Sequence, residues 1–184
     1  MAPNDSRFRE IVLYIAEKSE GDTTFGSAKL GKLLFYIDFY AYLLLGEPVT
    51  GQEYVRSEFG PAPRRLLALC DDMKTRGEIG IREKDYFGRI QLRVLALRSG
   101  DLCVFSAKEI ELVDLCLQRF RNCPVSQVSE LSNRLFKWHT IDDQATIPYE
   151  MALVARRDPT AQEFLKGKEV EAAAEEWLRG RVSA

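Results

Sequence analysis

The stretch KLGKLLFYIDFYAYLLLGEPVTG, residues 29–51, decides the fold of this chain. Leucine, isoleucine and alanine recur in it at spacings of three and four residues, the period of one face of an α-helix. Aromatic residues cover much of the remaining surface, so the helix should run through the middle of the domain. The apolar run is interrupted by Lys32 and Asp38, and is far shorter than the roughly 20 residues that a bilayer requires. The stretch therefore predicts a buried central helix over 27–45, with Ser27 as its N-cap.

Two lysines lie in the first turns of this predicted helix. Positive charge there opposes the helix dipole, so the helix itself gives no reason for Lys29 and Lys32. We interpret them as side chains that reach outward toward carboxylates of the fold or of a partner. Two solvated lysines are the simpler alternative.

Length and composition indicate one domain with a short appendage. A chain of 184 residues, 46% of them hydrophobic, can bury about 70% of its unfolded surface in one core. We place the domain at residues 1–157 and a charged C-terminal helix and tail at 158–184. The net charge of -2 argues against a dedicated nucleic-acid binder, although it leaves room for a local basic patch.

The N-terminus and the cysteines indicate the compartment. MAPNDSRFRE has neither the basic region nor the apolar region of a signal peptide. The four cysteines form no CxxC pair and no regular disulfide framework, so we expect buried thiols in a cytoplasmic protein with no membrane segment. The single histidine, His139, fits no zinc-ligand spacing and no Cys-His catalytic pattern. We therefore predict no metal, no cofactor and no catalytic residue.

The rest of the chain predicts further helices and one hairpin. An amphipathic helix is expected over 7–18, and an extended arm follows the central helix as far as Tyr54. A third helix should begin within GPAP, residues 60–63, because proline suits a helix start. Alternating apolar residues over 78–97 predict a β-hairpin.

The second half of the chain returns to helix. Residues 106–109, SAKE, form a capping box, and a further helix should follow Pro124. The predicted fold is thus mainly α with a small β-hairpin (α+β). We expect a compact single-domain helical bundle with winged-helix-like order in its first half.

Three helices followed by a hairpin also suggest a winged-helix DNA-binding regulator. The charges favour this alternative less, because the third helix mixes arginines with Asp71 and Asp72, and the hairpin mixes both signs. Phosphate contacts require a continuous positive surface. An enzyme with an unrecognised site is the remaining alternative, against which the lack of a nucleophile or phosphate-loop motif argues.

Three motifs in fixed order carry a family resemblance: KLGKLLFYIDFY at 29–40, GEPVTGQEY at 46–54 and FGP at 59–61. They resemble the Panacea domain of the SocA-like antitoxins, which occur in bacteria and phages. The resemblance covers about residues 7–155. One departure is that Trp138 directly precedes His139, whereas family members often carry the histidine before a tryptophan.

The resemblance implies a non-enzymatic, antitoxin-like protein-interaction module. Such domains neutralise toxins by direct contact, and SocA is also an adaptor that delivers its toxin to a ClpXP-type protease. The expected partner is thus a toxin or other client protein. The candidate recognition residues are Lys29, Lys32, Tyr36, Tyr54, Phe59, Gly60, Pro61, Arg64 and Arg65. The structural alternative places Tyr36 and Phe59 in the core and has Gly60 and Pro61 only direct the start of a helix, while the charged candidates would be solvated or would form internal salt bridges.

Overall fold

The computed structural model describes residues 4–57, 60–86, 88–135 and 140–153. It is mainly helical with small antiparallel sheets, which confirms the predicted α+β class. The helices are α1 (Asp5–Lys18), α2 (Ser27–Leu45), α3 (Leu66–Thr75), α4 (Ala107–Phe120) and α5 (Val125–Leu135), with short 3-10 turns η1 (Leu102–Val104) and η3 (Tyr149–Leu153). The strands are β1 (Tyr54–Val55), β2 (Ala62–Pro63), β3 (Ile79–Tyr86), β4 (Arg89–Ala96) and β5 (Thr146–Ile147).

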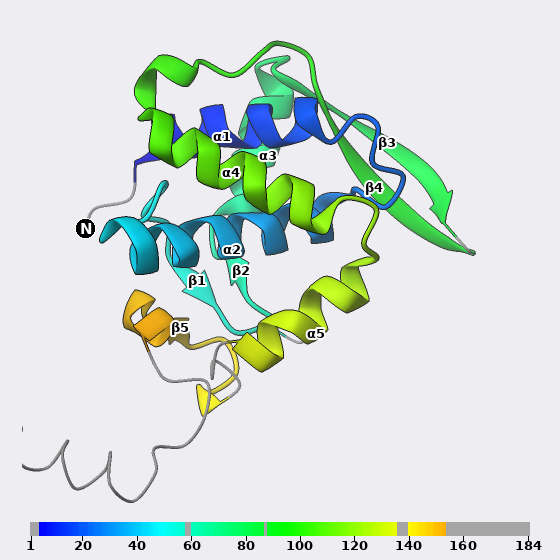
Figure 1. Cartoon of the computed structure of the whole chain (residues 1–184). Coiled ribbons are helices and arrows are strands. Elements are labelled where there is room, and N and C mark those ends of the chain that lie inside the picture. Colours follow the sequence, from blue (N-terminus) through cyan, green and yellow to red (C-terminus); the bar gives the residue numbers. More distant parts are fainter. Residues whose placement is uncertain (1–3, 58–59, 87, 136–139, 154–184) are drawn as a thin grey trace, which may run out of the picture. The chain divides into compact units, whose positions relative to one another are not determined.

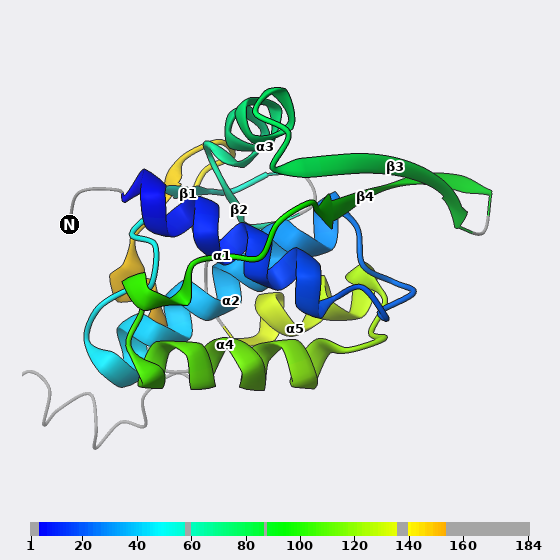
Figure 2. The ribbon, with the colours of Figure 1, turned by 90° about the horizontal axis from the view of Figure 1, so that it is seen from above.

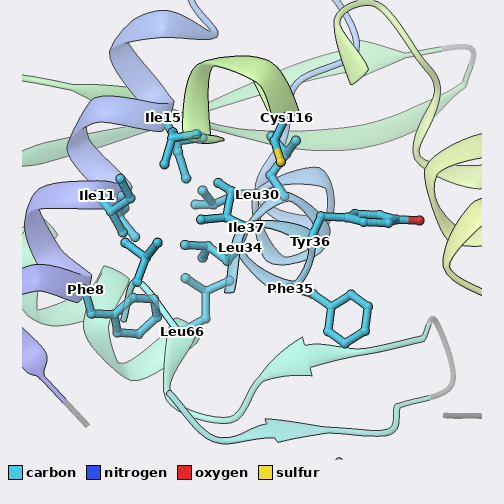
Figure 3. Packing of buried hydrophobic residues seen from close by; sticks show 14 of the residues in the cluster. Phe8, Ile11, Ile15, Leu30, Leu34, Phe35, Tyr36, Ile37, Leu66 and Cys116 are labelled. Carbon is cyan, nitrogen blue, oxygen red and sulfur yellow. The ribbon is translucent and has the colours of Figure 1, made fainter. Parts of the chain in front are cut away.

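The central position predicted for α2 is confirmed. This helix contacts α1, α4, α5, β2, β4 and η3, and it lies between α1 and α4 on one side and the small sheet on the other (Figure 1). Figure 3 shows Ile11 and Ile15 of α1 pointing toward Leu30 and Leu34 of α2. All four side chains are almost completely buried. Because α2 is apolar on nearly every face, several elements can pack around it at once.

The ends of α2 follow helix-capping rules, with one correction. The N-cap is Gly26, in an extended conformation and without a side-chain bond, whereas Ser27 is already helical. At the other end, Gly46 adopts φ +85° and donates its N–H to the carbonyl oxygen of Tyr42 at 3.1 Å. This left-handed conformation favours glycine, so Gly46 ends the helix where the sequence predicts.

The predicted start of the third helix is wrong. Pro63 belongs to β2, and α3 begins only at Leu66. β2 pairs with β1, which also pairs with β5, so that Tyr54 lies opposite both Pro63 and Ile147. The prolines thus end an extended segment instead of opening a helix, because β1 offers a pairing partner that local sequence does not reveal.

The hairpin and the second-half helices agree with the sequence. β3 and β4 pair in antiparallel register from Ile79 opposite Ala96 to Tyr86 opposite Arg89. The distal part of this hairpin extends beyond the helices (Figure 2). Ser106 and Glu109 form the predicted capping box of α4, and α5 follows Pro124. The helix expected over 158–184 and the boundary at 157 lie outside the described residues.

Candidate protein-interaction site

Lys29 lies in the interior, with a side chain that is 1% exposed. Its Nζ donates to Asp22 Oδ2 at 2.6 Å and to Thr24 Oγ1 at 2.7 Å. Burial raises the pKa of the Asp22 carboxyl, but the bonds from Lys29 and Thr24 outweigh burial and leave that pKa below its usual value. Lys29 therefore meets a carboxylate of the fold itself, and the pair holds the turn between α1 and α2.

Lys32 is also buried, at 4% exposure, but its environment differs. Nζ donates to the carbonyl oxygen of Pro61 at 3.0 Å, and no carboxylate of the described residues forms an ion pair with it. Burial without a compensating charge lowers the pKa of Lys32 to about 8. The expectation that both lysines reach outward is therefore wrong, because the fold encloses their ammonium groups.

Asp38 is the centre of a buried polar cluster. Its carboxylate accepts the backbone N–H of Thr50 at 2.8 Å and the hydroxyl of Tyr54 at 2.9 Å. The hydroxyl of Thr50 donates to it as well. The hydroxyl of Tyr149 lies 3.2 Å from the carboxylate and shares its proton with the carbonyl oxygen of Gln52 at 2.7 Å. Complete burial raises the pKa of Asp38, although these hydrogen bonds favour its charged form. We call Asp38, Thr50, Tyr54 and Tyr149 the Asp38 cluster.

The Asp38 cluster joins parts of the chain that lie far apart in sequence. It links α2 to the GEPVTGQEY segment and to η3, so the first two motifs meet at this carboxylate. Sequence reasoning noted Asp38 only as an interruption of the apolar run. A lone carboxylate in an otherwise apolar helix was the available signal, since a buried charge requires nearby donors.

Two candidate tyrosines also lie in the interior. Tyr36 is fully buried and donates its hydroxyl to the carbonyl oxygen of Val128 at 2.9 Å, and its ring lies 4.5 Å from that of Phe120 between centroids. Figure 3 shows Tyr36 on the side of α2 that faces away from Ile11 and Ile15. Tyr54 is buried in the Asp38 cluster. Tyr36 thus matches its structural alternative as a core residue, and Tyr54 is enclosed as well.

Gly60 and Pro61 of the FGP motif lie next to Lys32. Gly60 has φ +93° and donates its N–H to the carbonyl oxygen of Ser57 at 2.9 Å. This backbone conformation explains the glycine. Pro61 is buried and presents its carbonyl to Lys32. Phe59 lies outside the described residues.

Arg64 and Arg65 are exposed, and each forms an ion pair within the fold. Arg64 Nε lies 3.0 Å from a Glu53 oxygen. Arg65 donates two parallel bonds to Asp5, at 2.7 and 2.9 Å. Exposed pairs of this kind contribute little to stability, so both guanidinium groups could exchange their carboxylates for those of a partner. Their part in recognition remains a prediction.

Groups that could carry chemistry are few among the described residues. No group of three or more His, Cys, Asp or Glu side chains in that part of the chain could hold a metal ion. All four cysteines are free, and burial raises the pKa of Cys70 to about 11 and that of Cys116 to about 12. Thiols with such pKa values are protonated and unreactive near neutral pH. His139 lies outside the described residues.

A concave pocket of about 270 Å³ lies between α4 and α5. Phe120 and Leu131 are among its lining residues, together with the exposed Arg119. The volume is below the range usual for small-molecule sites.

Among the helices that the structure describes, none has the length and apolar composition of a membrane span.

The comparisons with known proteins agree with the motif order. The family model described as antitoxin SocA-like, Panacea domain, matches residues 30–139, which is more than half of the chain. This match contains α2 from Leu30 onward, the Asp38 and Thr50 positions and the whole hairpin. No curated protein and no solved structure matches the chain. Most of the central helix, the second and third motif segments and the hairpin lie inside that match, and this chain therefore belongs to the SocA-like antitoxin family and carries a Panacea domain.

Proposed function

We propose that this protein neutralises a partner toxin by binding it directly and covering the surface on which the toxin acts. Family membership supports a role in a toxin-antitoxin system and favours a non-catalytic protein. The observation that carries the proposal is the use of the polar groups of α2. Lys29 and Asp38 both form hydrogen bonds within the fold. The most specific motifs of the chain therefore maintain a rigid scaffold, and recognition depends on surface side chains.

A rigid scaffold suits direct neutralisation. The Asp38 cluster fixes η3 and the segment before β1 against α2, and a preformed surface loses little conformational entropy on binding. Arg64 and Arg65 remain candidate contacts, because arginine is among the residue types that contribute most at interfaces. Free cysteines are compatible with the reducing cytoplasm, where we place this activity.

The experiment is a growth assay with the protein encoded next to this gene as the candidate toxin. Expression of that protein alone should arrest growth, and co-expression of this chain should restore it. The purified pair should form a complex of fixed stoichiometry. Normal arrest in the presence of a folded, abundant antitoxin would contradict the proposal for that toxin.

Direct occlusion and delivery to a protease predict different outcomes of the growth assay in a strain that lacks the ClpXP-type protease. We expect neutralisation to persist in cells that lack the ClpXP-type protease, because occlusion requires only the complex. Loss of neutralisation in that strain, with the toxin then accumulating, would identify the chain as an adaptor instead.

The order of helices and strands on which the DNA-binding alternative is based is present, but the charges of the described residues do not favour it. β1 and β2 separate α2 from α3, so these helices do not form a helix-turn-helix. Arg65 and Arg76 are paired with Asp5 and Asp72. We expect no appreciable affinity for random duplex DNA at physiological salt, measured by fluorescence anisotropy. Sub-micromolar binding with a steep salt dependence would favour the regulator instead.

A further inference from the structure

The two faces of the β3–β4 hairpin differ in chemistry. Side chains directly opposite each other, or two apart on one strand, share a face. By the register, one face carries Ile79, Ile81, Glu83, Asp85, Ile90, Leu92, Val94 and Ala96, and we call it the Ile90 face. The opposite face carries Gly80, Arg82, Lys84, Gln91, Arg93 and Leu95, and we call it the Arg93 face.

The Arg93 face is occupied by the fold where β4 passes the turn between α1 and α2. Arg93 donates to the carbonyl oxygens of Asp22 and Ser19 at 2.8 and 2.9 Å, and Gln91 donates to that of Thr24 at 3.1 Å. These bonds fix the hairpin against the helices. The Ile90 face is therefore presented at a defined angle.

The Ile90 face begins in the core and continues into solvent. Ile79 at the base and Val94, directly opposite Ile81, are each 1% exposed. Toward the tip the exposed fraction rises to 36% for Ile81, 42% for Leu92 and 73% for Ile90. Figure 2 shows this part of the hairpin extending past the ends of the helices. Three large apolar side chains thus form one continuous exposed strip.

The other exposed large apolar residues are distributed over several elements. They are Leu43, Leu44 and Leu45 of α2, Leu67 of α3, Leu97 after β4, Val104 of η1, Leu115 of α4, Val125 of α5 and Leu153 of η3. The three leucines of α2 are consecutive, so they point about 100° apart around the helix axis. Scattered apolar residues are normal on a protein surface, whereas a contiguous strip marks an interaction site.

Charge defines the chemistry of the partner. Glu83 and Asp85 lie on the Ile90 face beside the apolar strip, directly opposite Leu92 and Ile90. Both are exposed, and neither forms an ion pair with another described side chain. A matching surface has an apolar centre with lysines or arginines along one side. A phosphate backbone does not match, because these carboxylates would repel it.

We infer that the Ile90 face is the surface that binds the toxin, through an apolar patch bordered by basic residues on that toxin. This inference rests on the proposed function and names its interface. It places the main contact on the hairpin and leaves Arg64 and Arg65 outside the centre of the interface. Apolar residues at an interface centre contribute most to affinity when the complex excludes water from them.

The test measures binding of the purified product of the reading frame adjacent to this gene, by calorimetry. The first variant combines Ile90→Ser with Leu92→Ser and should weaken binding by at least about 30-fold, the equivalent of one hot spot. The second combines Glu83→Lys with Asp85→Lys and should weaken it by about 10-fold or more. The matched control, Arg82→Ser with Lys84→Ser on the other face, should stay within about 3-fold of wild type.

Because the substituted residues are exposed, all three variants should keep the wild-type thermal unfolding temperature. Tight binding by wild type together with equal binding by the Ile90–Leu92 variant would overturn the inference and leave the proposed function intact. No binding by wild type would count against the proposed function itself for that protein, and against this interface with it.

Two other binding partners of the Ile90 face or of the hairpin, a second copy of this chain and duplex DNA, would give distinct results. Sedimentation of the isolated protein should show a monomer. A dimer that the Ile90–Leu92 variant dissociates would show that a second copy covers this face. Binding of random duplex DNA that is lost with the Arg82–Lys84 variant would assign the hairpin to nucleic acid. Either result would overturn the inference.

Discussion

The first turns of α2 and the distal half of the hairpin both differ from the usual burial of apolar residues and exposure of charged ones. The first region buries charged side chains, and the second exposes apolar ones. In α2, Lys29 and Lys32 are buried, whereas on the hairpin Ile81, Leu92 and Ile90 are in contact with water. Burying an ion costs several kcal/mol unless it is paired, and exposing a large aliphatic side chain forgoes up to about 1.5 to 3 kcal/mol. Contacts within the fold account for the placement of Lys29, whereas no contact among the described residues accounts for the exposed apolar strip. The comparison indicates that the family motifs build the scaffold, and the interaction surface that we propose lies outside the most recognisable motif.

The Asp38 cluster should give the largest effect. Asp38→Ala leaves the Thr50 N–H and the hydroxyls of Thr50 and Tyr54 without their acceptor in the interior, whereas the Tyr149 hydroxyl keeps the carbonyl oxygen of Gln52 at 2.7 Å. Each lost acceptor costs about 1 to 3 kcal/mol, so we expect a loss of at least about 4 kcal/mol or a failure to fold. Urea unfolding measures it, with exposed Asp71→Ala as the control. A loss below about 1 kcal/mol would show that the cluster does not support the scaffold.

The two buried lysines allow a matched comparison. Lys29→Met removes the partner of Asp22 and should cost about 3 to 5 kcal/mol, because it leaves a buried carboxylate unpaired. The same substitution at Lys32 removes a buried charge that has no paired carboxylate among the described residues, and should stabilise the fold. Urea unfolding of both variants checks the opposite signs. Equal losses would mean that the two ammonium groups have similar environments.

Ile79 and Ile90 share a residue type and a face of the hairpin but differ in burial. Ile79→Ala should cost about 2 to 5 kcal/mol, as buried large-to-small changes do. Ile90→Ala should cost less than about 0.5 kcal/mol, because its side chain is 73% exposed. Thermal and urea unfolding give both values. A large loss for Ile90→Ala would show that its side chain packs within the monomer, which would count against the interaction surface.

The pKa of Lys32 gives a pH dependence. The folded protein releases this proton near pH 8, whereas the unfolded chain holds it to about 10.5, so the unfolded state binds more protons in that window. The contribution of Lys32 to stability therefore rises with pH from 8 to 10.5, by about 2 to 3 kcal/mol. Buried groups with raised pKa values, such as Cys116, act in the opposite direction.

The free energy of unfolding is measured as a function of pH for wild type and for Lys32→Met. The difference between the two curves removes these opposing contributions, because both proteins share them. The variant should be the more stable protein at pH 7, and the difference should shrink toward pH 10.5. A constant difference across that range would show that Lys32 keeps its proton in the fold as readily as in water.

The exposed arginines should give the smallest effect. A double-mutant cycle of Arg65→Ala and Asp5→Ala should show a coupling free energy of about 0.2 to 1 kcal/mol, reduced at high salt. Chemical denaturation at two salt concentrations measures it. A coupling above about 2 kcal/mol would identify this bidentate pair as part of the scaffold and make its exchange for a partner carboxylate costly.

The candidate site could be predicted only in part. The motifs correctly identified the family and the segments that matter to the fold. They could not show that Lys29, Lys32 and Tyr36 point inward, because polar side chains in an apolar helix suggest a surface until their partners are known. The apolar strip of the hairpin looked like an ordinary half-buried strand pattern. Nothing in the alternation itself tells how far the strands extend beyond the helices.

Local sequence was enough to place α2 at Ser27–Leu45, the hairpin, and the capping box of α4, because helical period, strand alternation and caps depend on residues a few positions apart. Tertiary structure alone decided the rest. Pro63 became part of a strand because β1 pairs with it, and Asp38 became a buried hub because Tyr149, 111 residues away, reaches its carboxylate. The direction of a charged side chain and the pairing of a short extended segment depend on such distant partners, and the free energy of those contacts exceeds local preference.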